Sequence, residues 1–153
     1  MRFTTTDLKE FDVIGITVRT INQHGRSKKD ISELWQKFFR DDIIEQIPNK
    51  ESNDIYCIYT DYETDFNGPY TTLLGCKVSR LEYIPQGLIG KTIPESKFQL
   101  YKSTGKVPDC VLATWRLIWQ SDIDRKYLAD FDVYTNKLQD PDNAEVKTYV
   151  SVN

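Results

Sequence analysis

The string FDVYTN, Phe131 to Asn136, repeats the pattern of an earlier string, YCIYTD, Tyr56 to Asp61. In both strings apolar or aromatic side chains recur at alternate positions, which is typical of β-strands. Each string is followed by a turn-rich segment and then by a second candidate strand, at Thr71–Tyr83 in the first case and from Ala144 in the second. The two strings therefore predict two matching β-hairpins.

An amphipathic helix is predicted before each of these strings. The segments Asp30–Phe39 and Cys110–Trp119 both place apolar residues at helical spacing, so that one stripe of each helix can cover a sheet. When the segments are aligned, the tryptophan of the first falls on the first tryptophan of the second. We expect Asp30 to be the N-cap of the first helix, and the second helix to begin at Pro108-Asp109.

A further candidate strand precedes each helix, from Phe11 in the first case and from Lys97 in the second. The sequence thus predicts an α+β fold made of a duplicated β-α-β-β module, with pseudo-repeats at about residues 8–85 and 95–153 of one domain. The segment IPQGLIGKTIP joins the two repeats. One hairpin with one helix buries too little surface to be stable alone, so we expect the repeats to pack together, with a ligand groove at their seam.

The composition indicates the class of protein. The chain has 153 residues, of which 39% are hydrophobic, as in one compact domain, and it is rich in Tyr and Phe. The net charge of −3 argues against a nucleic-acid partner. No apolar run is long enough to span a membrane, and the three cysteines show no metal-ligand spacing. We therefore expect a reduced, cytoplasmic protein.

The alternation within FDVYTN places one carboxylate among aromatic side chains. If Phe131 and Val133 face the helices, Asp132 lies on the opposite face of the sheet. The tyrosines expected on that same face are Tyr59, Tyr134 and Tyr149. A carboxylate surrounded by phenol rings is suited to bind a cation. The alternative interpretation is that Asp132 is an ordinary exposed strand residue, and that the tryptophans belong to the core.

Three parts of the sequence carry a family resemblance: the run from Ile55 to Val78, the helix with Trp115 and Trp119, and the string DFDVYTN. They resemble the GyrI-like, or AraC-type, effector-binding domains and are most similar to the integron-associated branch. The resemblance extends from Phe11 to the C-terminus. It implies the duplicated fold with a groove between its halves. It also places the family's cation-binding acid at Asp132, where Glu is usual.

This resemblance implies a small-molecule effector-binding protein that takes an aromatic cation as its ligand, without a cofactor. The candidate ligand-binding residues are Asp132, Tyr134, Tyr149, Tyr59, Trp115 and Trp119. No residue is assigned to catalysis or to a metal. No helix-turn-helix is predicted, so direct contact with nucleic acid is not expected.

Two alternative functions stay open at this point. Some members of the family resemble hydrolases of strained small molecules, and Asp132 with Tyr134 or Tyr149 has groups suited to acid–base work. Other members modulate a protein partner, as gyrase inhibitors do. The loop with Glu63, Asp65 and Phe66 lies near the expected mouth of the groove and is interpreted as a solvated turn.

Overall fold

The computed structural model describes residues 3–135 and 142–153. Asn136 and most of the turn predicted between the last two strands lie outside these residues. The elements, in chain order, are β1 (Thr4–Leu8), β2 (Phe11–Thr20), α1 (Arg26–Arg40), α2 (Ile43–Gln46), β3 (Ile55–Thr60), β4 (Tyr70–Val78), β5 (Ile89–Ile93), β6 (Ser96–Gly105), α3 (Asp109–Trp119), β7 (Ala129–Tyr134) and β8 (Ala144–Val152).

The strands of the described residues form a single eight-stranded sheet with the order β1-β6-β8-β7-β3-β4-β2-β5. Every strand pairing is antiparallel. From the central pair β7–β3 outwards, the two sides of the sheet have the same order. Each side consists of a hairpin, then the strand that precedes a helix, then an edge strand. The predicted α+β fold is confirmed, and the mirrored order supports a duplicated module.

The predicted start of helix α3 is correct, whereas the predicted N-cap of helix α1 is not. Helix α3 begins at Asp109, directly after Pro108, as predicted. Helix α1 begins at Arg26, with Gly25 at its N-cap at φ 71°, so the prediction that Asp30 caps this helix was wrong. Asp30 instead lies within α1, where it accepts a hydrogen bond from Thr20 Oγ1 at 2.9 Å. Glycine is suited to this start because it adopts a positive φ without strain.

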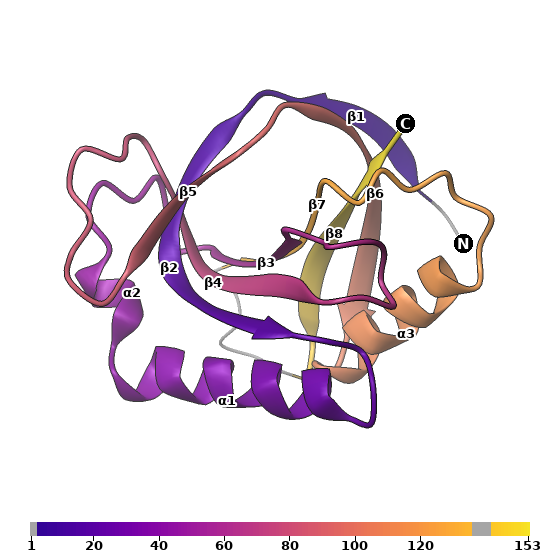
Figure 1. The fold of residues 1–153 in the computed structure, drawn as a ribbon, viewed down its shortest axis with the longest axis horizontal. Coiled ribbons are helices and arrows are strands. Elements are labelled where there is room, and N and C mark those ends of the chain that lie inside the picture. Colours follow the sequence, from indigo (N-terminus) through magenta and orange to yellow (C-terminus); the bar gives the residue numbers. More distant parts are fainter. Residues whose placement is uncertain (1–2, 136–141) are drawn as a thin grey trace.

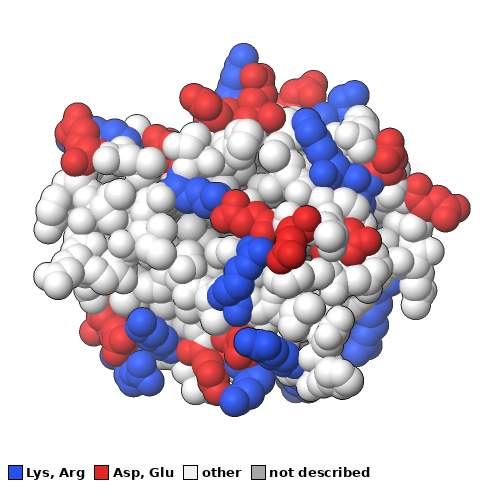
Figure 2. All heavy atoms as spheres, in the orientation of Figure 1, with Lys and Arg blue, Asp and Glu red and all other residues white. Residues whose placement is uncertain are grey.

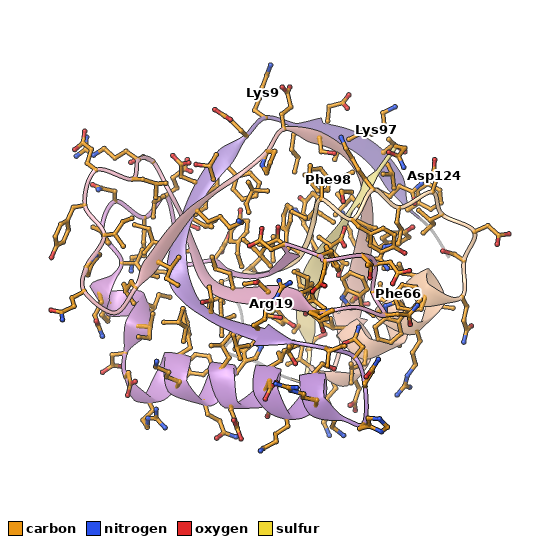
Figure 3. All side chains as sticks on the ribbon, viewed as in Figure 1. Lys9, Arg19, Phe66, Lys97, Phe98 and Asp124 are labelled. Carbon is orange, nitrogen blue, oxygen red and sulfur yellow. The ribbon has the colours of Figure 1, made fainter. Side chains whose placement is uncertain are left out.

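The helices cover one face of the sheet, and the outer strands bend over the other (Figure 1). The helix side holds Leu34 and Phe38 of α1 and Val111 and Ile118 of α3 in one buried cluster with the strands. The opposite face has a separate buried cluster that includes Phe98, which points into the space enclosed by the curved sheet (Figure 3). Both faces of the central strands are therefore buried, and all six residues of β7 are buried.

The surface charges are mixed. On the face drawn in Figure 2, lysine and arginine side chains are interspersed with aspartate and glutamate, and exposed pairs such as Lys9 with Glu95 form ion pairs. In the part of the chain that the structure describes, no helix is long and apolar enough to cross a membrane.

Candidate functional site

Asp132 lies at the centre of the sheet and is completely buried. Its Oδ1 accepts a hydrogen bond from Thr148 Oγ1 at 2.5 Å, and its Oδ2 accepts one from the Tyr59 hydroxyl at 3.1 Å. The indole Nε1 of Trp115 donates to both carboxylate oxygens, at 3.1 and 3.3 Å. The carboxylate is therefore held from three sides by donors that carry no charge.

Burial raises the pKa of Asp132 from 3.8 to about 6. The hydrogen bonds from Thr148, Trp115 and Tyr59 favour the charged form and offset part of this rise, whereas the nearby Asp130 carboxylate adds to it. The result is a buried acid that changes its charge just below neutral pH.

The strand register explains which side chains meet at this site. Asp132 pairs with Cys57 of β3 on one side and with Thr148 of β8 on the other, so all three point to the same face. That face is the one covered by the helices, because Trp115 of α3 contacts Asp132. The expectation that Phe131 faces the helices and Asp132 faces away was therefore wrong. Both faces of β7 are buried, so the position of its apolar residues does not reveal where the helices lie.

Aromatic side chains from both halves surround the acid. The ring of Tyr59 meets that of Trp115 edge to face, with centroids 5.5 Å apart, and Trp115 packs against Trp119 at 6.2 Å. On the other side Tyr134 meets Trp35 edge to face at 5.0 Å. Burial raises the pKa of both Tyr59 and Tyr134 well above the usual value, so both phenols stay neutral. The predicted grouping of Asp132 with these two tyrosines on one face is what the structure contains.

Tyr149 does not join this group. It pairs across the strands with Phe131, and the two rings stack with centroids 4.7 Å apart. Because Phe131 is adjacent to Asp132 in the strand, both rings lie on the face away from the helices. There Tyr149 borders a groove of about 480 Å³, together with Phe11, Tyr56 and Phe131.

A second groove, of about 310 Å³, opens on the helix side. It lies between the start of α1, the β3–β4 loop and the end of α3, and is lined by Asn22, Gly25, Ser27, Phe66, Asn67 and Trp119. Trp119 is 44% exposed and contacts Trp115, which in turn bonds Asp132. The indoles of Trp119 and Trp115 thus connect this groove to the carboxylate of Asp132. Phe66, which the sequence assigned to a solvated turn, forms part of the wall.

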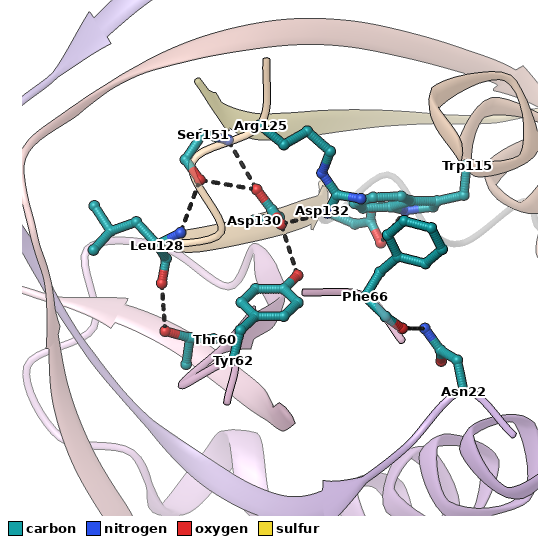
Figure 4. Close-up of polar contacts among 10 residues, drawn as sticks. All are labelled: Asn22, Thr60, Tyr62, Phe66, Trp115, Arg125, Leu128, Asp130, Asp132 and Ser151. Carbon is teal, nitrogen blue, oxygen red and sulfur yellow. Dashed lines mark hydrogen bonds and ion pairs between the residues drawn. The ribbon is translucent and has the colours of Figure 1, made fainter. Parts of the chain in front are cut away.

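Sequence analysis missed an ionic cluster beside this site. Asp130, two residues before Asp132, is fully buried and accepts a hydrogen bond at 2.8 Å from Nη2 of Arg125 (Figure 4). Tyr62 and Ser151 donate to the same carboxylate. The period of two within β7 places Asp130 on the face of Asp132, so the pattern contained a signal for it. Arg125 lies in a loop, where no periodicity predicts the position of a side chain.

The antiparallel sheet with helices on one face is the fold that the resemblance to the GyrI-like effector-binding domains implied. The chain belongs to the family of integron-associated effector binding proteins, whose model matches residues 4–152.

Three individual proteins are similar to this chain, one in sequence and two in fold. The Bacillus subtilis (strain 168) protein YobU, a candidate transcriptional regulator by name, is 29% identical over 154 residues, which cover 97% of this chain and 95% of YobU. The Vibrio cholerae integron cassette protein VCH_CASS2 has the same fold, with a TM-score of 0.78 and 23% identity over 99% of this chain and 95% of its own. SAV2435, solved with bound tetraphenylphosphonium, gives a TM-score of 0.81 with 15% identity and covers 100% of this chain and 94% of its own.

Proposed function

We propose that this effector-binding protein binds lipophilic aromatic cations, with Asp132 as the counter-charge and Tyr59, Tyr134, Trp115 and Trp119 as the surrounding walls. The observation that carries the proposal is a fully buried carboxylate whose three hydrogen-bond partners, Thr148, Trp115 and Tyr59, are all uncharged. Burying a carboxylate without a counter-ion is costly. A bound cation removes that cost.

The same physics explains selectivity. A cation beside Asp132 favours the ionised form of an acid whose pKa burial has raised to about 6. A neutral ligand provides no such compensation, so the acid discriminates against it. Aromatic rings attract cations through their faces and accept many apolar shapes. The site is therefore suited to a class of ligands rather than to one compound.

Access to the acid requires a movement. Asp132 has no exposed surface, and the side chains of Trp115 and Tyr59 lie against its oxygens. A ligand that touches the carboxylate must displace at least one of these two side chains. Trp115 is the better candidate, because it continues through Trp119 to the groove on the helix side.

One of the two residue pairs expected for the alternative acid–base function, Asp132 with Tyr149, is not brought together. Tyr149 lies on the opposite face of the sheet from Asp132, so these residues cannot act together on one substrate. The tyrosine that does bond the acid is Tyr59, from the first half of the chain.

The decisive test is the substitution Asp132→Asn, titrated calorimetrically with tetraphenylphosphonium at neutral pH. We expect affinity to fall at least tenfold, because the amide keeps the shape of the side chain but removes its charge, while circular dichroism and thermal unfolding show a folded domain. Asp7→Asn, at an exposed position of β1, is the matched control and should leave affinity unchanged. Equal affinities for Asp132→Asn and the unsubstituted protein would exclude the cation site.

A further inference from the structure

A second buried charge lies close to the Asp132 site, and it is positive. The side chain of Arg125 is only 6% exposed. Its guanidinium carbon lies 4.5 Å from the ring centroid of Tyr127, 5.7 Å from that of Trp115 and 5.9 Å from that of Phe66. An ion pair with Asp130 at 2.8 Å fixes one end of the group. Burial lowers the pKa of Arg125, but Asp130 together with Tyr62 and Tyr127 more than offsets this, so its pKa lies above the usual value and the group stays charged.

This guanidinium has hydrogen-bonding capacity that the folded chain does not use. Arginine carries five N–H donors. Nη2 donates to Asp130, but Nε and Nη1 are buried and have no hydrogen-bond partner among the described residues. The faces of Tyr127, Trp115 and Phe66 stabilise the charge, yet they do not replace acceptors for N–H groups that lie in the plane of the guanidinium. An acceptor that reached either nitrogen would therefore be bound favourably.

The position of Arg125 ties it to the proposed ligand site. Trp115 contacts both charged groups: its Nε1 donates a hydrogen bond to Asp132, and its ring lies against the guanidinium of Arg125 (Figure 4). The other wall, Phe66, lines the groove on the helix side. Displacement of Trp115 by a ligand would thus uncover the carboxylate of Asp132 and the guanidinium of Arg125 together.

We infer that the ligands of this protein are zwitterions, in which an aromatic cation binds Asp132 and a carboxylate binds Arg125. Arg125 is then the residue that determines specificity within the class of aromatic cations, and Asp130 holds it in position. A carboxylate fits because it is an acceptor-only group and forms strong, charge-assisted hydrogen bonds with guanidinium. This inference rests on the proposed function and names the ligand class of the same site.

A matched set of three ligands tests the inference. Tetraphenylphosphonium is a plain cation, and its 3- and 4-carboxyphenyl derivatives carry the same cation with a carboxylate at two different reaches. We expect the protein at neutral pH to bind at least one carboxyphenyl isomer roughly tenfold more tightly than tetraphenylphosphonium, the gain typical of a hydrogen bond to a charged group. Calorimetric titration measures all three affinities.

The variant Arg125→Lys isolates the contribution of the unpaired donors. Lysine keeps a positive charge for Asp130, so the buried aspartate is not left unpaired, but it lacks the planar array of donors. We expect this variant to lose the preference for the zwitterion, so that the carboxyphenyl isomers and tetraphenylphosphonium bind to it with similar affinities. If the lysine variant is unstable, the double substitution Arg125→Met with Asp130→Asn removes both charges and should also abolish the preference.

The outcomes separate this inference from the proposed function. If the unsubstituted protein binds tetraphenylphosphonium as tightly as both isomers, or more tightly, and Asp132→Asn still weakens binding, the zwitterion inference is wrong while the cation site stands. A preference that persists in the Arg125 variants would also overturn it. If no phosphonium binds, or if Asp132→Asn has no effect on any of them, both proposals fail.

Discussion

At the scale of single residues, two aspartates in one strand illustrate how surroundings set function. Asp130 and Asp132 lie two residues apart in β7, share a face and are both fully buried. Asp130 has a permanent counter-ion in Arg125. Among residues 3–135 and 142–153, Asp132 has only neutral donors. The first is therefore suited to stabilise the fold, and the second is suited to receive a cation from outside.

The pKa of Asp132 predicts how ligand affinity depends on pH. Under the proposed function a cation binds the ionised form of this acid, whose pKa is about 6. Lowering the pH from about 7.5 to about 5 should then weaken binding of tetraphenylphosphonium roughly tenfold. Tetraphenylphosphonium has no titratable group, so calorimetry at several pH values reports on the protein alone. In Asp132→Asn the dependence over this range should disappear; a dependence that survives would assign it to another group.

Unlike ligand affinity, the stability of the ligand-free protein should rise as the pH is lowered. Burial raises the pKa of Asp132 above the unfolded value of 3.8, so the folded chain binds the proton more tightly than the unfolded chain. The contribution of this residue to stability is therefore complete below about pH 4 and is lost as the pH rises through about 6.

From the sequence it could be predicted that Asp132, Tyr134 and Tyr59 share one face of the sheet, but not that the helices cover this face. Alternation correctly placed Asp132, Tyr134 and Tyr59 on one face, because neighbouring strands of a sheet keep their side chains in register. It could not tell which face the helices cover, since apolar residues occupy both faces of the central strands. The position of Arg125 could not be predicted, because it depends on tertiary contacts of a loop rather than on a local sequence pattern.

At the scale of elements, strand signals were strong in the centre of the sheet and weak at its edges. The start of β8 at Ala144 was predicted correctly. The edge strands β1 and β5 were not predicted: each pairs with one neighbour only, and the sequence of β1, TTTDL, is largely polar. Strand β5 falls in the segment interpreted as the joint between the repeats, where two prolines and two glycines obscured it.

The bend of the sheet depends on a pair of glycines. Gly15 of β2 and Gly75 of β4 face each other across the strands, in the middle of the strongly curved β2 (Figure 1). A Cβ atom on Gly75 would lie 2.1 Å from the carbonyl oxygen of Ile14, and one on Gly15 equally close to that of Leu74. Both obstacles are backbone atoms, so only glycine allows this close approach of the strands.

The substitution Gly75→Ala should therefore be strongly destabilising. We expect the free energy of unfolding in urea to fall by about 2–3 kcal/mol, as for other overpacked positions. Gly90→Ala is the matched control, because the atoms nearest to a Cβ there belong to two flexible side chains, Ile84 and Leu81, and not to the backbone. It should cost less than about 1 kcal/mol. Equal losses in the two variants would mean that the close approach at Gly75 does not constrain the sheet.

At the scale of the whole molecule, each half of the chain contributes a tryptophan that packs on a tyrosine of the other half, as expected for two related copies. The alignment of the two strand strings places Cys57 on Asp132, and these residues are direct partners across the central strand pair. Trp35 of the first half packs on Tyr134 of the second, and Trp115 of the second packs on Tyr59 of the first. The halves thus complete one site together, although only the second half supplies the acid.

A circular permutation tests whether each half is a structural unit. Only Pro94 and Glu95, both exposed, connect β5 to β6. The start of β1 and the end of β8 both flank β6, with Thr4 opposite Leu100 and Val152 opposite Lys97. A flexible linker of about eight residues, with a mean span of about 16 Å, can therefore join the two ends of the chain.

We expect the permutant that is opened between Pro94 and Glu95 to fold with the circular dichroism spectrum of the original chain and to bind tetraphenylphosphonium with similar affinity. The reason is that the cut separates the halves but leaves every strand pairing and both hairpins intact. Opening the chain instead between Leu73 and Leu74, two fully buried residues of β4, interrupts a strand that is paired on both sides and should prevent folding. An unfolded Pro94–Glu95 permutant would show that the covalent order of the halves, and not only their packing, is needed to form the site.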